Sequence, residues 1–473
     1  MRRRLVLGSL ALLAAGCTVG PDYVRPTVDV PPLWRIDTGT AEALANTAWW
    51  QQFDDPVLDR LIEQALANNR DLLIAAARVE QFTGQLTSTR SQFFPQIGYG
   101  ADASRNRASR VGVPALPPGA DPYSTIYNAA LSAQWQIDLF GRVRRQTEAA
   151  QAQVYASEQG RRGVVLTVVA GVASGYIVLR GLDRQLEIAR ATAENYAGTK
   201  RIMDLRFTGG VVSLVEAEQV NSQYEQARAA IPALEQQVAA QENLISLLLG
   251  ANPGPIPRGL AIDRLRVPRV PADLPSSLLE RRPDILQAEQ NLVAANANVG
   301  AAQALYYPQL SLTGVLGSTS AALGDFLSSA SLAWSAAMAL TGPIVTFGAI
   351  EGQVASAEAA KREALANYQR VILNAFRETN DALVGSTKKR EELGAQTRRV
   401  TALREYARLS TLKWDNGYAD YLAVLVAQNE LFAAELAAVG SEVDSLTQIV
   451  AVYAALGGGW VDLAAMRAPR PGS

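Results

Sequence analysis

The stretch YNAALSAQWQIDL, residues 127–139, alternates between apolar and polar side chains along its whole length. Its odd-numbered positions form an apolar face of Tyr127, Ala129, Leu131, Ala133, Trp135, Ile137 and Leu139. Its even-numbered positions form a largely polar face of Asn128, Ala130, Ser132, Gln134, Gln136 and Asp138. A period of two residues predicts a β-strand with two different environments on its two faces.

Two environments are possible for the apolar face. In a membrane β-barrel it contacts lipid, while the polar face lines a water-filled interior. In a soluble sandwich it is covered by a protein core. The length favours the barrel, because about ten residues or more suit a tilted strand that crosses a bilayer. The same alternation returns on later residues: Leu310, Leu312 and Leu316, then Leu332, Trp334, Ala336, Met338 and Leu340.

Two uncharged stretches resemble transmembrane helices by composition. Residues 327–350 are long enough to span a bilayer, but they contain Pro343 and alternate with period two, so we interpret them as strand. Residues 164–179 are shorter than the roughly 20 residues that a helical span needs. They also contain Gly171 and Gly175, and we expect them to form a buried helix.

The chain contains a tandem repeat. FFPQI (93–97) returns as YYPQL (306–310), and NRDLL (69–73) returns as RPDIL (282–286), in both cases 213 residues later. Three further pairs lie 207 residues apart: LFGR (139–142) with TFGA (346–349), RFTGG (206–210) with KWDNG (413–417), and SLLLG with VYAALG, which end at Gly250 and Gly457. The common order of these pairs indicates that each half forms the same structural unit.

Each half is expected to contain a helix, a strand pair and a long helical hairpin. The expected helices are 56–94 and 276–307, ended by Pro95 and Pro308; 141–207 and 348–414; and return helices that end at Gly250 and Gly457. The expected division is a signal peptide, 1–16; an N-terminal segment, 17–55; a first repeat, 56–250, with hairpin 96–140; a Pro-rich connector, 251–275; a second repeat, 276–457, with hairpin 309–345; and a C-terminal tail, 458–473.

The return helices carry the apolar spacing of coiled coils. The first seam is Val220, Tyr224, Ala227, Ile231, Leu234, Val238, Ile245 and Leu248, interrupted at Gln241; the second is Phe432, Leu436, Val439, Val443, Leu446, Val450 and Tyr453. Pro232 should kink the first return helix. A helix of about 65 residues spans on the order of 100 Å, so each hairpin is expected to be an elongated strut rather than part of a globule.

Counting strands predicts an oligomer. Two hairpins supply four strands per chain, whereas open sheet edges are forbidden in lipid and the smallest barrels have about eight strands. Chains must therefore share a barrel. Eight strands from two chains would leave little lumen and twelve from three would leave a channel, but strand counting alone does not choose between them.

The N-terminus predicts a lipid anchor. Arg2, Arg3 and Arg4 precede a short apolar stretch, and LLAAGC (12–17) ends at Cys17, the only cysteine. This arrangement is typical of a secretory signal and resembles a bacterial lipobox, which would make Cys17 a diacylated N-terminus. In such lipoproteins, Thr18 rather than aspartate after the cysteine favours the outer membrane. The alternative is an ordinary signal peptide with an incidental cysteine.

Composition excludes several classes of function. The 44 basic and 45 acidic residues nearly cancel, so no basic face for nucleic acid is indicated. The chain has no histidine, which removes the commonest general base and the commonest metal ligand. No Walker loop, GxSxG or GxGxxG motif occurs, and no carboxylates form a recognisable catalytic pair. We therefore expect neither an enzyme nor a metal site.

Four motifs together resemble the TolC-like outer membrane factors, and more narrowly their lipoprotein branch, which serves tripartite RND-type efflux pumps. They are GCTVGPDYVRP (16–26), WWQQFDDPVLDRLIEQALANNRDL (49–72), WQIDLFGR (135–142) and LLERRPDILQAEQNLVAANANVGAA (278–302). The resemblance implies a homotrimer with a twelve-stranded outer-membrane β-barrel, a long α-helical coiled-coil barrel in the periplasm and an equatorial belt. It implies a passive duct that works with a periplasmic adaptor and an inner-membrane pump, with no cofactor except the lipid on Cys17.

The resemblance also implies a gate near the two glycine turns. The apolar ring position falls on Leu422, and the acidic position that follows falls on Val426, so that carboxylate is absent here. The aromatic–basic pair that holds the mouth closed falls on Trp414 and Asp415, where the basic member is missing. Three carboxylates lie close enough to replace the acidic ring: Asp420, Glu216 and Glu218. For each glutamate, an ordinary solvated helix face is an equal alternative.

Adaptor docking is expected at the turn residues Gly209, Gly210, Asn416 and Gly417. Two other functions are compatible with these sequence features. One is a lipid-anchored periplasmic coiled-coil scaffold or adaptor, although an adaptor would carry small β-domains around a single helical hairpin. The other is the outer-membrane duct of a type I protein secretion system. The sequence identifies neither the cargo nor the particular pump and adaptor.

Overall fold

The computed structural model describes residues 18–31, 34–35, 48–110, 116–117, 119–269, 277–457 and 460–465. The chain forms two compact units, each made of several segments. The first unit contains residues up to Thr27, Gln81–Ala156 and Ala288–Tyr368; the second contains Val28–Glu80, Ser157–Gln287 and Gln369–Ser473. Cys17, the expected signal peptide and most of the expected C-terminal tail lie outside the described residues.

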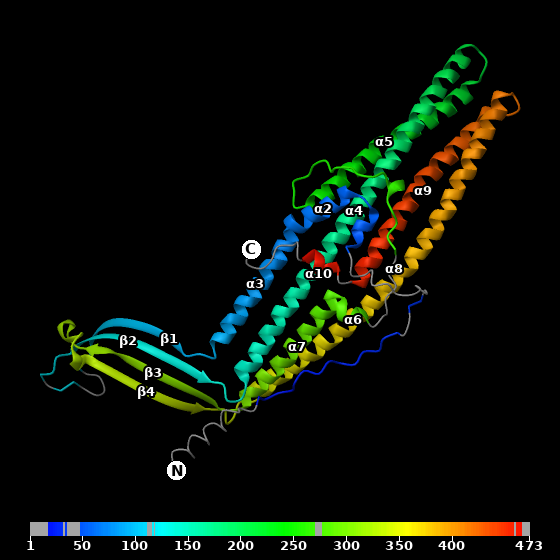
Figure 1. Ribbon diagram of the computed structural model, residues 1–473. Coiled ribbons are helices and arrows are strands. Elements are labelled where there is room, and N and C mark those ends of the chain that lie inside the picture. The colour runs from blue at the N-terminus through cyan, green and yellow to red at the C-terminus, as the bar shows by residue number, and fades with distance from the viewer. Residues whose placement is uncertain are drawn as a thin grey trace. The chain divides into compact units, whose positions relative to one another are not determined.

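The first unit holds an antiparallel four-stranded sheet with strand order β1-β2-β3-β4 (Figure 1). The strands are β1 Gln96–Arg107, β2 Tyr123–Ile137, β3 Gln309–Ser320 and β4 Leu332–Thr341. Each half of the sequence supplies one hairpin, and β2 pairs with β3 to join the two halves. The stretch 127–137 is therefore a strand, as its alternation predicts.

Long helices make the chain mainly α-helical. The helices are α2 Pro56–Asn68, α3 Arg70–Ser91, α4 Arg142–Thr208, α5 Leu214–Leu248, α6 Leu278–Arg281, α7 Pro283–Gln303, α8 Ala349–Asp415, α9 Tyr421–Leu456 and α10 Trp460–Ala465. Short 3-10 helices occupy Trp49–Phe53, Ile262–Arg264, Ala304–Tyr306, Leu323–Asp325 and Ser329–Ser331. The end of α4 and α5 form one helical hairpin, and α8 and α9 form the second (Figure 1).

The first helix of each repeat is broken, which corrects the continuous helices expected over 56–94 and 276–307. The breaks fall at Asn69 and Arg282, the same position in the two repeats. Arg282 precedes Pro283 and adopts an extended backbone, as steric contact with the proline ring requires. Asn69 is also extended, and its side-chain oxygen accepts hydrogen bonds from the amides of Asp71 (2.9 Å) and Leu72 (3.1 Å), which caps the start of α3.

Both coiled-coil seams are packed in the second unit. Val220, Ala227, Leu234 and Ile245 are buried on α5, as are Phe432, Val439, Leu446, Val450 and Tyr453 on α9. The polar interruption at Gln241 is satisfied, because its side-chain amide donates to the carbonyl of Gly175 at 2.9 Å. The helix α5 continues through Pro232. Two apolar faces of the hairpins are therefore covered by packing.

The main core of the second unit surrounds the uncharged part of α4. Val165, Val168, Val169, Val172 and Tyr176 are buried there, together with aromatic side chains from other segments. Those aromatic residues include Trp49, Trp50, Phe53, Tyr453 and Trp460, and Trp49 stacks on Tyr453 with ring centroids 5.1 Å apart. Two described helices, α4 and α9, contain windows long and apolar enough to cross a membrane. In α4, residues 164–179 contribute buried side chains to this core, as predicted.

A buried carboxylate ties the connector to this core. Asp55 is almost fully buried and accepts hydrogen bonds from the amide of Val57 (2.8 Å), the hydroxyl of Tyr176 (2.8 Å) and the amide of Leu260 (2.9 Å). The hydroxyl of Tyr176 in turn accepts from the amide of Gly259 at 2.8 Å. Burial and the neighbouring carboxylate raise the pKa of Tyr176, so the hydroxyl remains protonated.

Candidate functional site

The apolar face of the sheet is continuous across all four strands. The strand register places Tyr99, Leu131, Leu316 and Trp334 in one row. A second row contains Trp135, Leu312 and Met338. Among the described residues this face is uncovered: Tyr99, Leu131, Leu316, Trp334, Met338 and Leu340 are all exposed, and Trp334 is 75% accessible. An exposed apolar face of this size indicates that the sheet contacts lipid or another protein surface.

The opposite face of the sheet is polar. The side-chain amide of Gln136 donates to Gln309 across strands at 2.9 Å, and that of Asn128 donates to Asp102 at 3.2 Å. Gln96, Ser132 and Gln134 belong to the same face. The contrast between the two faces is the pattern of a barrel wall with lipid on one side and water on the other.

Within the residues that the structure describes, both outer edges of the sheet are open. In the described sheet β1 pairs with β2 alone and β4 pairs with β3 alone. Each edge therefore presents a row of backbone N–H and C=O groups that lack strand partners. Hydrocarbon cannot satisfy those groups, so an edge in lipid must pair with another strand.

The two helical turns have the same backbone construction. In the first, the amide of Val211 donates to the carbonyl of Arg206 (2.8 Å) and Gly210 has φ of +71°. In the second, the amide of Tyr418 donates to Lys413 (2.8 Å) and Gly417 has φ of +76°. Glycine suits the left-handed conformation that both helix C-termini need. The predicted glycine turns thus form where the repeat places them.

The gate candidates on α9 differ in their surroundings. Leu422 and Val426 lie one helical turn apart and are both exposed, so they share a face that the described part of the chain leaves uncovered. Asp420 is the N-cap residue of α9, but its side chain makes no capping hydrogen bond. Its carboxylate is therefore not committed to the helix end. All three residues are exposed beside the second turn.

The candidates on α5 have local partners. Glu216 completes a capping box with Ser213: its carboxylate accepts from the Ser213 amide (2.7 Å) and hydroxyl (2.9 Å). These hydrogen bonds lower the pKa of Glu216. The carboxylate of Glu218 accepts from the side chain of Asn221 at 3.0 Å. Both lie in the first turns of α5, where Glu218 is exposed, Glu216 is half-buried and Glu216 already has a structural role.

Sequence reasoning missed a cation beside Trp414. Asp415 ends α8 and provides no basic group, but the guanidinium of Arg206, at the end of α4, lies over the Trp414 ring at 4.8 Å from its centroid. Trp414 also packs edge to face against Tyr421, with centroids 4.9 Å apart. The motif RFTGG contains Arg206, yet only the tertiary structure brings it to the other hairpin.

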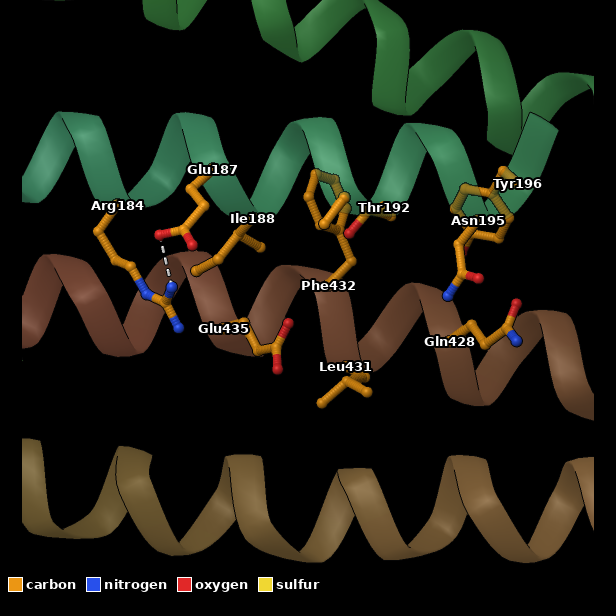
Figure 2. A pocket seen from close by; sticks show the side chains of 11 residues that line it. Arg184, Glu187, Ile188, Thr192, Asn195, Tyr196, Gln428, Leu431, Phe432 and Glu435 are labelled. Carbon is orange, nitrogen blue, oxygen red and sulfur yellow. Dashed lines mark hydrogen bonds and ion pairs between the residues drawn. The ribbon is translucent and has the colours of Figure 1, made fainter. Parts of the chain in front are cut away.

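A groove lies between α4 and α9 further from the turns (Figure 2). Arg184 and Glu187 form an ion pair at 2.6 Å at one end, and Phe432 contributes an apolar surface. Glu435 lines the groove but is paired with Arg404 at 2.8 Å. The charged side chains of this groove are therefore paired with each other or with neighbours, and they form no catalytic arrangement.

The family model described as outer membrane efflux protein matches residues 61–251 and 274–458, which are the two repeats. The chain belongs to this family. The outer membrane efflux proteins similar to it include the probable efflux pump outer membrane protein TtgC of Pseudomonas putida, 34% identical over 97% of this chain and 96% of the relative. The probable outer membrane lipoprotein SilC of Salmonella typhimurium is 30% identical over 97% of this chain and 99% of the relative.

Solved structures of outer membrane channels share the fold. The outer-membrane channel OprN has a TM-score of 0.83 and 31% identity, and the comparison covers 94% of this chain and 100% of OprN. The open-state MtrE channel of Neisseria gonorrhoeae has a TM-score of 0.85 and 29% identity, with 94% and 99% coverage. As an outer membrane efflux protein, this chain is a transport duct of the outer membrane rather than an enzyme.

Family membership favours contact with lipid over an unfinished sandwich core for the uncovered row of Leu131, Leu316 and Trp334. It also selects the duct over the periplasmic scaffold. The repeat found in the sequence corresponds to the two halves that the family model matches.

Proposed function

We propose that three copies of this chain form a closed duct whose twelve strands cross the outer membrane. The open edges of β1 and β4 support this proposal most strongly, since each copy offers two edges that only other copies can pair. The strands alternate in direction, so β4 of one copy can continue antiparallel into β1 of the next. Three arcs of four strands leave a water-filled lumen, which two arcs would not.

The helical hairpins continue the duct into the periplasm, and the turns form its mouth. Leu422 supplies an apolar ring, and the unengaged carboxylate of Asp420 lies beside it as the acidic ring. Three like charges near one axis attract cations. Because Val426 replaces the following acid, the constriction carries less negative charge than the resemblance implies.

A periplasmic adaptor docks at the turns. Exposed apolar side chains surround the first turn, namely Leu205, Phe207, Val211, Leu214 and Val215, and Tyr418 is exposed at the second. A soluble surface rarely gathers so many apolar side chains at one tip unless a partner covers them. Gly209, Gly210, Asn416 and Gly417 set the backbone of these tips. The adaptor in turn connects the duct to an inner-membrane pump.

The exported molecules are small solutes or drugs. The relatives are named for efflux pumps, among them an antibiotic efflux pump protein and a solvent efflux pump protein of Pseudomonas putida. These names favour a drug or solvent pump over a protein secretion system as the context of this chain. A duct with a polar interior selects weakly, so the pump determines the cargo.

Cys17 carries the lipid anchor. It lies outside the described residues, but the next segment is held at the end of the sheet that adjoins α4: the amide of Val19 donates to the carbonyl of Phe140 at 3.1 Å, just after β2. The similar protein SilC is named as a lipoprotein. Acyl chains on Cys17 would enter the bilayer directly from this position.

Purified protein in planar bilayers tests the duct. A heat-sensitive trimer on gels, together with ion conductance through the reconstituted protein, is the expected result. A monomer without conductance would contradict it. A trimer that does not conduct ions would agree with the proposed assembly but contradict the proposed open lumen.

A further inference from the structure

Residues 19–22, which follow Cys17 closely, are held by hydrogen bonds from buried polar side chains of the first unit. Besides the Val19–Phe140 hydrogen bond, the side-chain amide of Asn296 on α7 donates to the carbonyl of Pro21 at 2.9 Å. Asn296 is almost fully buried. The segment is thus bound through its backbone, so the site fixes its position independently of most of its side chains.

Arg145 provides most of the polar contacts. Its guanidinium donates to the carbonyls of Val19 (3.2 Å) and Gly20 (3.1 Å) and to the carboxylates of Asp22 (2.8 Å) and Glu148 (2.8 Å). The residue is only 4% exposed. The planar guanidinium has several N–H donors in fixed directions, so it can reach two carbonyls and two carboxylates at once. The single ammonium group of lysine cannot reproduce these contacts.

Glycines allow the close approach. Gly20 has φ of +98°, and a Cβ atom on it would lie 2.3 Å from the Cα of Gly300. A Cβ atom on Gly141 would lie 2.8 Å from the side chain of Thr18. We call Gly141, Arg145, Asn296 and Gly300 the N-terminal socket. Three of the motifs quoted for the family resemblance meet in it, although they are far apart in sequence.

Aromatic residues mark this level of the sheet as a membrane interface. One lies at each junction between a strand and a helix: Phe94 before β1, Phe140 after β2, Tyr307 before β3 and Phe347 after β4. Phe94, Tyr307 and Phe347 are exposed, and Phe140 stacks on Tyr307 with centroids 4.7 Å apart. Aromatic belts at this depth are typical of proteins that cross bilayers.

Resting on the lipidation proposed for Cys17, we propose that Arg145 is a positioning residue that sets the anchor at the inner surface of the bilayer. Only Thr18 separates Cys17 from Val19, and two residues span at most about 7 Å. The socket therefore holds the acylated end beside the aromatic belt. The segment between Cys17 and the socket is then a short tether. It keeps the sheet close to the membrane and so raises the effective concentration of the strands there while the barrel forms.

Tether length gives the sharpest test. About 12 Gly/Ser residues inserted between Cys17 and Thr18 leave the socket intact but lengthen the tether roughly sevenfold. The rate of trimer formation in vesicles should fall on the order of tenfold, because effective concentration decreases with about the −3/2 power of length. The same insertion between Asp29 and Val30, beyond the socket, is the matched control and should leave the rate unchanged.

Arg145→Gln should slow trimer formation similarly, and adding the insertion at Cys17 to it should slow it little further. Arg145→Lys should rescue only part of the rate. Equal rates in wild type, Arg145→Gln and the insertion variant would overturn the positioning role, as would equal effects of the two insertions. Mass spectrometry of the N-terminal peptide separates the hypotheses: an unacylated Cys17 rejects the proposed anchor, whereas an acylated Cys17 with unchanged rates rejects only the socket's role.

Discussion

The guanidinium of Arg206 lies over the ring of Trp414, 4.8 Å from its centroid, and joins the first helical hairpin to the second. The resemblance places a basic partner next to the aromatic residue, at Asp415, where this chain has an acid. The cation comes instead from α4 in the other hairpin. The two tips are thus connected within one chain despite the substitution at Asp415.

Removal of this cation should loosen the mouth. Arg206→Gln is expected to raise resting conductance in planar bilayers about fivefold, since a partly exposed cation–π pair contributes on the order of 1 kcal/mol. Arg201→Gln, an exposed arginine on the same helix, is the control and should have no effect. If the effects of Trp414→Leu and Arg206→Gln on resting conductance are fully additive in a double-mutant cycle, the two side chains do not interact in the gate, which would contradict this prediction.

The exposed residues Asp420 and Leu422 beside the second turn should set the constriction. Leu422→Ser and Asp420→Ala are each expected to raise resting conductance, and Asp420→Ala should also reduce cation preference, because it removes one charge from each copy. Ala423→Ser, which points to another side of α9, should behave as wild type. Unchanged conductance in both Leu422→Ser and Asp420→Ala would reject this location for the gate.

The two faces of β2 should tolerate charge differently. Leu131→Arg places a cation on the apolar row and should destabilise the barrel by about 2–4 kcal/mol, with loss of assembled trimer. Ser132→Arg, at the next position, places it on the polar face and should retain the trimer but change ion selectivity. Heat dissociation on gels and reversal potentials measure the two effects. Similar losses from both substitutions would contradict the assignment of faces.

The buried carboxylate of Asp55 should support the second unit. Asp55→Ala removes the cap of α2 and leaves the amide of Leu260 and the hydroxyl of Tyr176 without their acceptor, a cost of about 2–5 kcal/mol. Thermal unfolding followed by circular dichroism should show a clear decrease in the midpoint. Asp54→Asn, which removes an exposed ion pair with Arg266 but keeps a residue type suited to the left-handed backbone at this position (φ of 60°), should shift it little. Equal shifts would contradict the role of the network.

Periodic and repeated features were predictable from sequence. The strand of residues 127–137 and the glycine turns at Gly210 and Gly417 follow from local rules of alternation and left-handed backbone. Because the two halves repeat, a strand or turn predicted in one half also predicts its counterpart in the other. The burial of α4 side chains within residues 164–179 was predicted as well, from an uncharged run that contains Gly171 and Gly175.

Local helix breaks and long-range polar contacts were harder to predict. The break at Asn69 depends on a side-chain cap that competes with an otherwise continuous helical pattern. Arg206 and Trp414 are separated by more than 200 residues, and no local pattern specifies that they meet. In the sequence, Arg145 is likewise one of several arginines at the start of a helix. Only the folded structure shows that it binds the carbonyl of Val19 in the N-terminal segment.

Cysteine crosslinking of the sheet edges tests the central claim most directly. One cysteine replaces Ala101 on β1, and a second is placed in turn at positions 333–339 on β4, in outer membranes under mild oxidation. The account predicts that one register links β4 of each copy to β1 of the next and gives a covalent trimer. Exclusive linkage within single chains, or a monomer whose sheet is protected in water, would contradict the shared barrel.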